Sequence, residues 1–115
     1  MITIYGISNC DTMQKATKWL AARGVQYTFH NYKENGIDAP TLARWLTYFP
    51  ANKLVNTKST TYRALTDDEK EAATDNEKAI ELMMKFNSVI KRPVWDFGNG
   101  DMYLGWNEEE VSKRI

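Results

Sequence analysis

The first 32 residues carry the pattern of a strand, a helix and a second strand, and this limits the possible folds more than any other feature of the chain. Residues 2–5 are rich in β-forming types and precede a glycine. Apolar residues then recur at helical spacing from Met13, and Gly24 fits the position just after a helix. Residues 25–30 alternate between apolar and polar types, as a half-exposed strand does. A helical connection of this length joins parallel strands, so the pattern predicts a β-α-β unit.

Helices are predicted for the middle of the chain. Asp38 can cap one helix, and Thr66 and Thr74 each begin a capping box with a glutamate three residues later. The residues that we expect to point inward from the last of these helices are Ile80, Met83 and Met84. The chain is long enough for one domain with one core. We therefore expect a single domain over residues 1–115, with a helical insertion at about 33–87.

A β-hairpin and a short helix are predicted for the end of the chain. Residues 94–97 and 102–106 are two β-type segments, and the pair Asn99-Gly100 between them favours a tight hairpin turn. Asn107 can cap a closing helix. The predicted order is β-α-β, then helices, then β-β-α, which is typical of a mixed α/β protein.

Composition excludes several classes of function. The 15 basic and 15 acidic residues cancel, so no net charge attracts nucleic acid or an anionic membrane. No stretch reaches the roughly 18 apolar residues of a membrane-spanning helix, and the N-terminal segment lacks the basic leader of a signal peptide. One cysteine and one histidine exclude a zinc site of soft ligands and an internal disulfide within one chain. We therefore expect a cytoplasmic protein with no metal and no bound cofactor, membrane or nucleic acid.

Cys10, the single cysteine, is the candidate for chemistry. Free cysteines are usually small buried residues, but this one lies between the predicted first strand and helix, beside the polar residues Ser8, Asn9 and Asp11. There the unpaired N–H groups of the first helical turn and the helix dipole favour the thiolate, which is the nucleophilic form. Ligands often bind where strands of an α/β sheet end, and residues 91–93 before the third strand form the other expected wall of such a site.

Several motifs, spread in order over nearly the whole chain, carry a resemblance to known proteins. They are Tyr5-Gly6-Ile7-x-Asn9-Cys10-Asp11-Thr12, Ala16, Trp19-Leu20, Tyr32-x-x-x-Gly36, Thr60-Thr61-Tyr62, Ile90-Lys91-Arg92-Pro93 and Gly105-Trp106. These motifs resemble those of the arsenate reductase (ArsC)/Spx family, and the YffB-type proteins are the nearest branch. The resemblance implies an α/β, thioredoxin-like fold with an inserted helical subdomain.

The resemblance also implies roles for individual residues. Cys10 would be the nucleophile, and Arg92 would be the partner of the thiolate or of a bound anion. Pro93 would face the cysteine after a cis peptide bond and would contribute to substrate binding. The other residues expected to bind substrate are Asn9, Asp11, Thr12 and Lys58.

Two departures from the family's patterns bear on function. Arsenate-reducing members hold the oxyanion with three arginines, but here Lys58 replaces one, and residues 98–107 lack another, so we expect weak or no arsenate reduction. Met13 occupies the second position of the Cys-x-x-Cys motif, so the redox switch of Spx-type regulators cannot operate. A monothiol needs a second thiol from outside. We therefore expect a glutathione-dependent reductase in which Cys10 forms a mixed disulfide, with glutathione or another small thiol as co-substrate.

Two other hypotheses remain open. A non-catalytic, Spx-like regulator would bind RNA polymerase or another protein partner without turnover. A purely structural protein would use its aromatic residues for packing alone. Activation of Cys10 separates the first hypothesis from both alternatives, because only a reductase needs an activated thiol.

Overall fold

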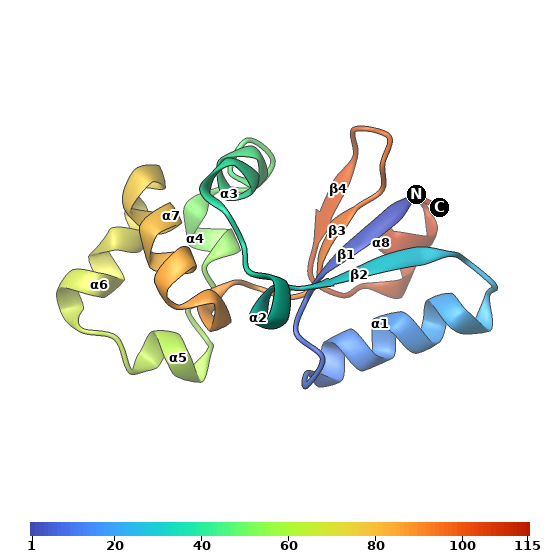
Figure 1. Ribbon diagram of the computed structural model, residues 1–115, viewed down its shortest axis with the longest axis horizontal. Helices are drawn as coiled ribbons and strands as arrows, with labels where there is room; N and C mark the ends of the chain where they lie inside the picture. The colour runs from blue at the N-terminus through green and yellow to red at the C-terminus, as the bar shows by residue number, and fades with distance from the viewer. The chain divides into compact units, whose positions relative to one another are not determined.

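The chain forms two compact units in the computed structural model, which describes residues 1–115 apart from the side chain of Ala72. The first, here called the sheet unit, consists of Met1–Gly36 and Arg92–Ile115. The second, the helical unit, consists of Ile37–Lys91. Figure 1 shows four strands with their helices in the sheet unit and a group of short helices in the helical unit.

The sheet unit contains four strands in the order β2-β1-β3-β4. The strands are β1 (Ile2–Gly6), β2 (Tyr27–Asn31), β3 (Val94–Asp96) and β4 (Met102–Leu104). β1 pairs in parallel with β2 and antiparallel with β3, and β3 and β4 form an antiparallel hairpin. The helices of this unit are α1 (Asp11–Ala22), α2 (Tyr32–Asn35) and α8 (Glu108–Ser112). The predicted β-α-β unit, hairpin and closing helix are confirmed.

One apolar core lies between the sheet and the helices α1 and α8. Because successive strand residues point to opposite faces, Ile2 and Ile4 of β1 share one face of the sheet with Trp95. The helical residues that pack on this face are Met13, Ala16 and Leu20 of α1 and Val111 of α8. Trp95 has no exposed surface, and its Nε1 donates a hydrogen bond of 2.8 Å to the carbonyl oxygen of Gly105. This packing fixes α1 against the strand that precedes it.

The helical unit consists of short helices, two of which begin at predicted caps. They are α3 (Ala39–Trp45), α4 (Ala51–Leu54), α5 (Thr60–Arg63), α6 (Asp67–Glu71), η1 (Ala72–Thr74), α7 (Asn76–Lys85) and η2 (Asn87–Val89). Asp38 accepts the N–H of Thr41 at 2.9 Å and caps α3. Thr66 and Glu69 form both bonds of the capping box of α6, at 2.9 and 3.2 Å.

Two details predicted for α7 are wrong. Its cap is Asp75, whose Oδ1 accepts the N–H of Glu77 at 3.1 Å, while Thr74 instead donates its hydroxyl to the carbonyl oxygen of Glu71. Met84 is exposed, because the helix turns a neighbouring stripe of residues inward. The buried residues of this stripe are Ala79, Leu82 and Met83, with Ile80 half-buried. The predicted residues and the buried residues both have helical spacing, so packing against α3 and η1 decides which of the two sets is buried.

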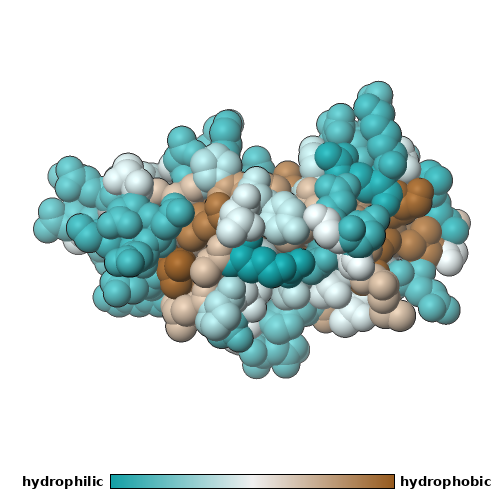
Figure 2. All heavy atoms as spheres, turned by 90° about the horizontal axis from the view of Figure 1, so that it is seen from above, coloured by the Kyte–Doolittle hydropathy of each residue, from teal (hydrophilic) through white to brown (hydrophobic). Residues whose placement is uncertain are grey.

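The surface of the described residues is mixed. Hydrophilic residues predominate on the face drawn in Figure 2, and apolar residues form separate small areas there. The large apolar side chains with substantial exposure in the described part of the chain are Met1, Tyr48, Met84 and Ile115. Single exposed residues of this kind are usual in folded proteins. Among the described helices, none has the length and apolar character needed to cross a membrane.

Replacing Gly98 by alanine is expected to destabilise the fold more than the same change at Gly100. Both glycines have positive φ, 77° and 88°, where an L-residue costs about 1–2 kcal/mol. A Cβ on Gly98 would also lie 2.8 Å from the carbonyl oxygen of Met1, whereas a Cβ on Gly100 would meet nothing within 4 Å. We expect the free energy of unfolding, measured by urea denaturation, to fall by about 2–3 kcal/mol for Gly98→Ala and by about 1 kcal/mol for Gly100→Ala. Equal losses in the free energy of unfolding for the two variants would show that the chain relieves the contact with Met1 at no free-energy cost.

Candidate functional site

The candidate site lies at one end of the sheet, where β1 and β2 end and β3 begins. Gly6 at the end of β1 pairs with Asn31 at the end of β2. β3 runs antiparallel to β1, and its first residue, Val94, pairs with Tyr5. The loop that follows β1 and the residues that precede β3 therefore meet at this end of the sheet.

Cys10 is the N-cap residue of α1 and has an extended backbone, with φ −149° and ψ 124°. Its carbonyl oxygen accepts a hydrogen bond of 3.0 Å from the N–H of Gln14. The backbone N–H groups of Thr12 and Met13, in the first helical turn, act on its sulfur and favour the thiolate, although the side chain makes no capping hydrogen bond. A Cβ on Gly6 would meet the side chain of Met13, so glycine lets the end of β1 lie close to that residue of α1. The sulfur is partly exposed and within reach of a reagent.

Arg92 comes to Cys10 from the start of β3. Its peptide bond to Pro93 is cis, as expected from the resemblance. Pro93 is buried, and its carbonyl oxygen accepts a hydrogen bond of 2.8 Å from the N–H of Gly105. The half-buried guanidinium of Arg92 hydrogen-bonds the sulfur of Cys10. The structure thus brings together a thiol and a permanent cation.

The pKa of the Cys10 thiol is lowered from its ordinary value. Burial is the largest single influence and would raise this pKa. The N–H of Met13, the hydrogen bond and charge of Arg92, and the N–H of Thr12 together outweigh it. Burial would likewise lower the pKa of Arg92, but its interactions with the sulfur and with Tyr32 raise it instead. The site therefore favours a thiolate, the form in which cysteine acts as a nucleophile.

Tyr32 is a site residue to which the sequence alone assigns no role. It follows directly after β2 and has no exposed surface, and the charge of Arg92 acts on its hydroxyl. Burial raises the pKa of Tyr32 to about 12, against the opposing influence of Arg92. The stretch Tyr32-x-x-x-Gly36 belongs to the motifs of the resemblance, but a buried tyrosine beside a strand usually indicates packing. The parallel register of β1 and β2 was the signal that could have placed it beside Cys10.

The remaining residues predicted to bind substrate do not all belong to the sheet unit. Asn9 and Asp11 flank Cys10 and are exposed, and Thr12 is half-buried. Lys58 belongs to the helical unit, where its N–H donates a hydrogen bond of 3.1 Å to Oδ1 of Asn56. Its participation in the site stays a prediction.

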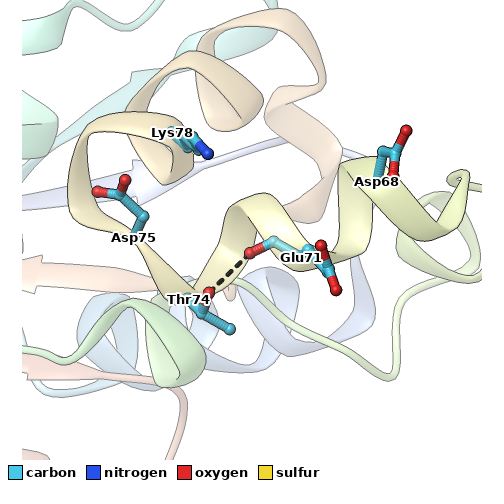
Figure 3. Close-up of a pocket in the computed structure, with 5 residues that line it drawn as sticks. All are labelled: Asp68, Glu71, Thr74, Asp75 and Lys78. Carbon is cyan, nitrogen blue, oxygen red and sulfur yellow. Dashed lines mark hydrogen bonds between the residues drawn. The ribbon is translucent and has the colours of Figure 1, made fainter.

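The helical unit has a depression of its own, drawn in Figure 3. The residues that line it are Asp68, Glu71, Thr74, Asp75 and Lys78. Figure 3 shows that its carboxylates point in different directions instead of converging on one point. Across the described residues, no group of three or more histidine, cysteine, aspartate or glutamate side chains is placed to hold a metal ion. The thiol at the end of the sheet is therefore the stronger candidate for chemistry.

Known proteins match the chain over most of its length. The sequence model of the ArsC family matches residues 5–114. A solved structure of a protein named YFFB is 39% identical, with a TM-score of 0.93 and coverage of 100% of this chain and 99% of that chain. An arsenate reductase (ArsC) related protein from Brucella melitensis is 43% identical, with a TM-score of 0.76 and coverage of 97% and 92%. The global transcriptional regulator Spx of Streptococcus mutans is 26% identical, with coverage of 96% and 80%.

These matches bear on two of the predictions from the sequence. The resemblance to the arsenate reductase/Spx family and its YffB-type branch is confirmed. The fold is also confirmed as a mixed α/β, thioredoxin-like one, with a four-stranded sheet and accompanying helices.

Proposed function

The chain belongs to the ArsC family, and we propose that it acts there as a glutathione-dependent monothiol reductase with Cys10 as its nucleophile. The observation that carries this proposal is the set of groups around the sulfur of Cys10. Two backbone N–H groups and the guanidinium of Arg92 act on it and lower the pKa of the thiol. A packing cysteine needs neither a cation nor a lowered pKa, whereas a nucleophile gains from both.

The reaction takes place in two exchange steps. In the first, the Cys10 thiolate attacks the glutathione sulfur of a mixed disulfide. A new S–S bond forms as the old one breaks, and the departing sulfur leaves as a thiolate that takes a proton from water. In the second, the thiolate of a free glutathione attacks the glutathione sulfur on Cys10, which releases glutathione disulfide and restores the Cys10 thiolate. The substrate sulfur is thus reduced, and glutathione is oxidised to its disulfide.

The second thiol has to come from outside because the chain has one cysteine, with Met13 three residues after it. Glutathione is the proposed donor, since its carboxylates suit charge-assisted hydrogen bonds with Arg92. Asn9, Asp11, Thr12 and Pro93 would line the bound glutathione. Lys58 is proposed only as an additional cation for it.

The proposal is tested by incubating the folded protein with glutathione disulfide and measuring its mass. We expect the addition of one glutathionyl group, its assignment to Cys10 by peptide mapping, and its removal by reduced glutathione. The matched comparison is the same reaction in denaturant. If the thiol reacts when unfolded but resists when folded, Cys10 is an inert residue and the proposal is wrong.

The second candidate is a non-catalytic, Spx-like protein that binds RNA polymerase or another partner. It is favoured by the similarity to the Spx regulator of Streptococcus mutans, which extends over 96% of this chain. This candidate predicts that a Cys10→Ser variant keeps full partner binding, whereas a reductase loses its reaction. In either case we place the protein in the reducing cytoplasm, since its thiol is unpaired.

A further inference from the structure

A small hollow opens between α1 and β2 in the sheet unit, next to the loop that carries Cys10. Its volume is about 210 Å³. The loop contributes Ser8, which precedes the nucleophile by two residues, and the start of α1 contributes Met13 and Gln14. The N–H of Gln14 donates to the carbonyl oxygen of Cys10 at 3.0 Å. The hollow and the nucleophile are therefore built on the same loop and the same helical turn. The residues that line the hollow are Ser8, Met13, Gln14, Thr17, Tyr27 and Phe29.

The hollow has an apolar interior and a polar rim. Met13 is buried, while Tyr27 and Phe29 are half-buried and pack against the apolar core of the sheet unit. These two aromatic residues are two positions apart in β2, so they share one face of the strand. Ser8 and Gln14 are exposed. None of the six lining residues carries a charge, so the hollow suits a neutral and mainly apolar group.

Hydrogen bonds hold the walls of the hollow in place. The amide of Asn31, at the end of β2, donates to the hydroxyl of Ser8 at 3.4 Å, which ties the nucleophile loop to that strand. The hydroxyl of Thr17 donates to the carbonyl oxygen of Met13 at 3.0 Å, so its proton is used within α1. The hollow is therefore formed before any ligand arrives, which lowers the cost of binding.

The size of the hollow limits what it can hold. A cavity of roughly 150 Å³ takes up one benzene molecule, whereas sites for whole drug-sized ligands have about 300–1,000 Å³. A volume of about 210 Å³ therefore suits one aromatic ring or one branched apolar group and is too small for a tripeptide such as glutathione. Glutathione also carries carboxylates, for which the lining residues offer no cation.

The order of the strands places the hollow and Arg92 on different sides of the nucleophile. β1, which leads to Cys10, lies between β2 and β3 in the sheet. β2 lines the hollow, whereas Arg92 precedes β3. The two halves of a disulfide extend away from the two sulfurs, so each half can lie on one of these sides.

We propose that the hollow binds the apolar half of a mixed disulfide between glutathione and an aromatic or branched apolar thiol. This inference rests on the proposed function and names its substrate class. The glutathione half lies toward Arg92. The Cys10 thiolate attacks the glutathione sulfur, an S–S bond forms as the old one breaks, and the apolar thiol leaves as a thiolate that takes a proton from water. A second glutathione then releases Cys10 as described above.

The proposal is tested by comparing two mixed disulfides of glutathione, one with phenylmethanethiol and one with mercaptoethanol. Both leaving groups are alkyl thiols, and the rates with the free small thiol N-acetylcysteine give their remaining intrinsic difference. Because part of the ring becomes buried, we expect Cys10 to prefer the phenylmethanethiol disulfide roughly five- to tenfold more than the small thiol does. The rates are measured from the growth of the glutathionyl adduct by mass spectrometry. Equal preferences for Cys10 and the small thiol would overturn the proposal.

Thr17→Phe fills the hollow from its helical wall and should reduce the preference to that of the small thiol. The matched control is Ala22→Phe, which places the same ring at an exposed position of α1 outside the hollow. We expect the control to keep the preference of the wild type. A preference that survives Thr17→Phe, or that both variants lose equally, contradicts the assignment of the hollow.

A second measurement needs neither a variant nor a reaction of the thiol. Benzyl alcohol is added to the wild type, and the methyl signals are followed by NMR. We expect the signals of Met13 and Thr17 to shift because a ring in the hollow lies beside them, and that of the exposed Met84 in the helical unit to stay unchanged. Unchanged signals of Met13 and Thr17 would overturn the proposal.

The two measurements also separate this inference from the proposed function. If benzyl alcohol shifts Met13 and Thr17 but neither disulfide modifies folded Cys10, the hollow stands as an apolar binding site and the reductase proposal fails. If both disulfides react without preference and the methyl signals do not move, the reductase proposal stands and the apolar site fails.

Discussion

Cys10→Ser is expected to lose all covalent reaction with glutathione disulfide, with no gain in mass after prolonged incubation. A serine hydroxyl does not exchange with disulfides, and no other cysteine is present to take over the attack. The side chains are similar in size and the site is partly exposed, so the free energy of unfolding should change little. Mass spectrometry measures the adduct, and urea denaturation checks that the variant is folded. A glutathionyl adduct on this variant would contradict the assignment.

A stricter control moves the thiol instead of removing it. The variant that combines Cys10→Ser with Ser8→Cys keeps one thiol in the same loop, at an exposed position away from the cap of α1. That thiol should behave as an ordinary cysteine, with only a few per cent thiolate at neutral pH. We expect it to react with glutathione disulfide severalfold more slowly than Cys10. If both thiols react at the same rate, the position of Cys10 does not activate it.

Much of the fold could be predicted from the sequence because its elements are marked by local signals. Alternation of apolar residues marks β2, helical spacing marks α1, and Asn99-Gly100 marks the hairpin between β3 and β4. The cap of α3 at Asp38 and that of α8 at Asn107 depend on hydrogen bonds within a few residues. Each of these features is decided by neighbouring residues, and so each is visible without a structure.

The errors occur where two local solutions are equally good. Thr74 and Asp75 are both favourable caps, and the structure uses the aspartate because the threonine hydroxyl bonds back to Glu71. Met84 and Leu82 both fit helical spacing, and packing in the helical unit buries Leu82. Choosing between such solutions requires contacts that are distant in the sequence.

The candidate site likewise has one part that local sequence signals predict and one part that depends on residues distant in the sequence. The place of Cys10 at the start of a helix follows from the strand, loop and helix pattern around it. The contact of Arg92 with the sulfur depends on the pairing of β3 with β1, so the sequence predicts residues 91–93 as a wall of the site but assigns Arg92 to the sulfur only through the family's motifs. The influence of Arg92 on Tyr32 depends on the register of β2 with β1. No local pattern distinguishes Tyr32 from a tyrosine that only fills the core.

Arg92→Ala is expected to slow the reaction of Cys10 with glutathione disulfide roughly tenfold at neutral pH. The change removes the hydrogen bond and charge of Arg92 that help lower the pKa of the thiol. A hydrogen bond to a charged group contributes about 1.5–3 kcal/mol, and the lower end applies because both groups are partly exposed. The rate of the Arg92→Lys variant should lie between those of the wild type and Arg92→Ala, since lysine keeps the charge but lacks the planar fork of the guanidinium. The matched control is Arg23→Ala, which removes the same charge from an arginine over the ring of Trp19 and should leave the rate unchanged.

The pH dependence of Arg92→Ala shows how the arginine acts. The rate rises with pH as the thiolate forms, and it rises first in the wild type because its Cys10 pKa is lower. Below both pKa values the wild type is therefore faster by a constant factor, and this factor shrinks between them. At pH values above both pKa values, the variant's more basic thiolate is the stronger nucleophile, with a Brønsted slope of about 0.4–0.5. The variant should therefore match or exceed the wild type there toward a neutral disulfide.

Toward glutathione disulfide the variant should stay slower at these pH values too, because the reagent's carboxylates lose Arg92 as a partner. A constant deficit toward the neutral disulfide at every pH would mean that Arg92 does not set the pKa of Cys10. Coincident profiles for both reagents would reduce Arg92 to a solvated charge.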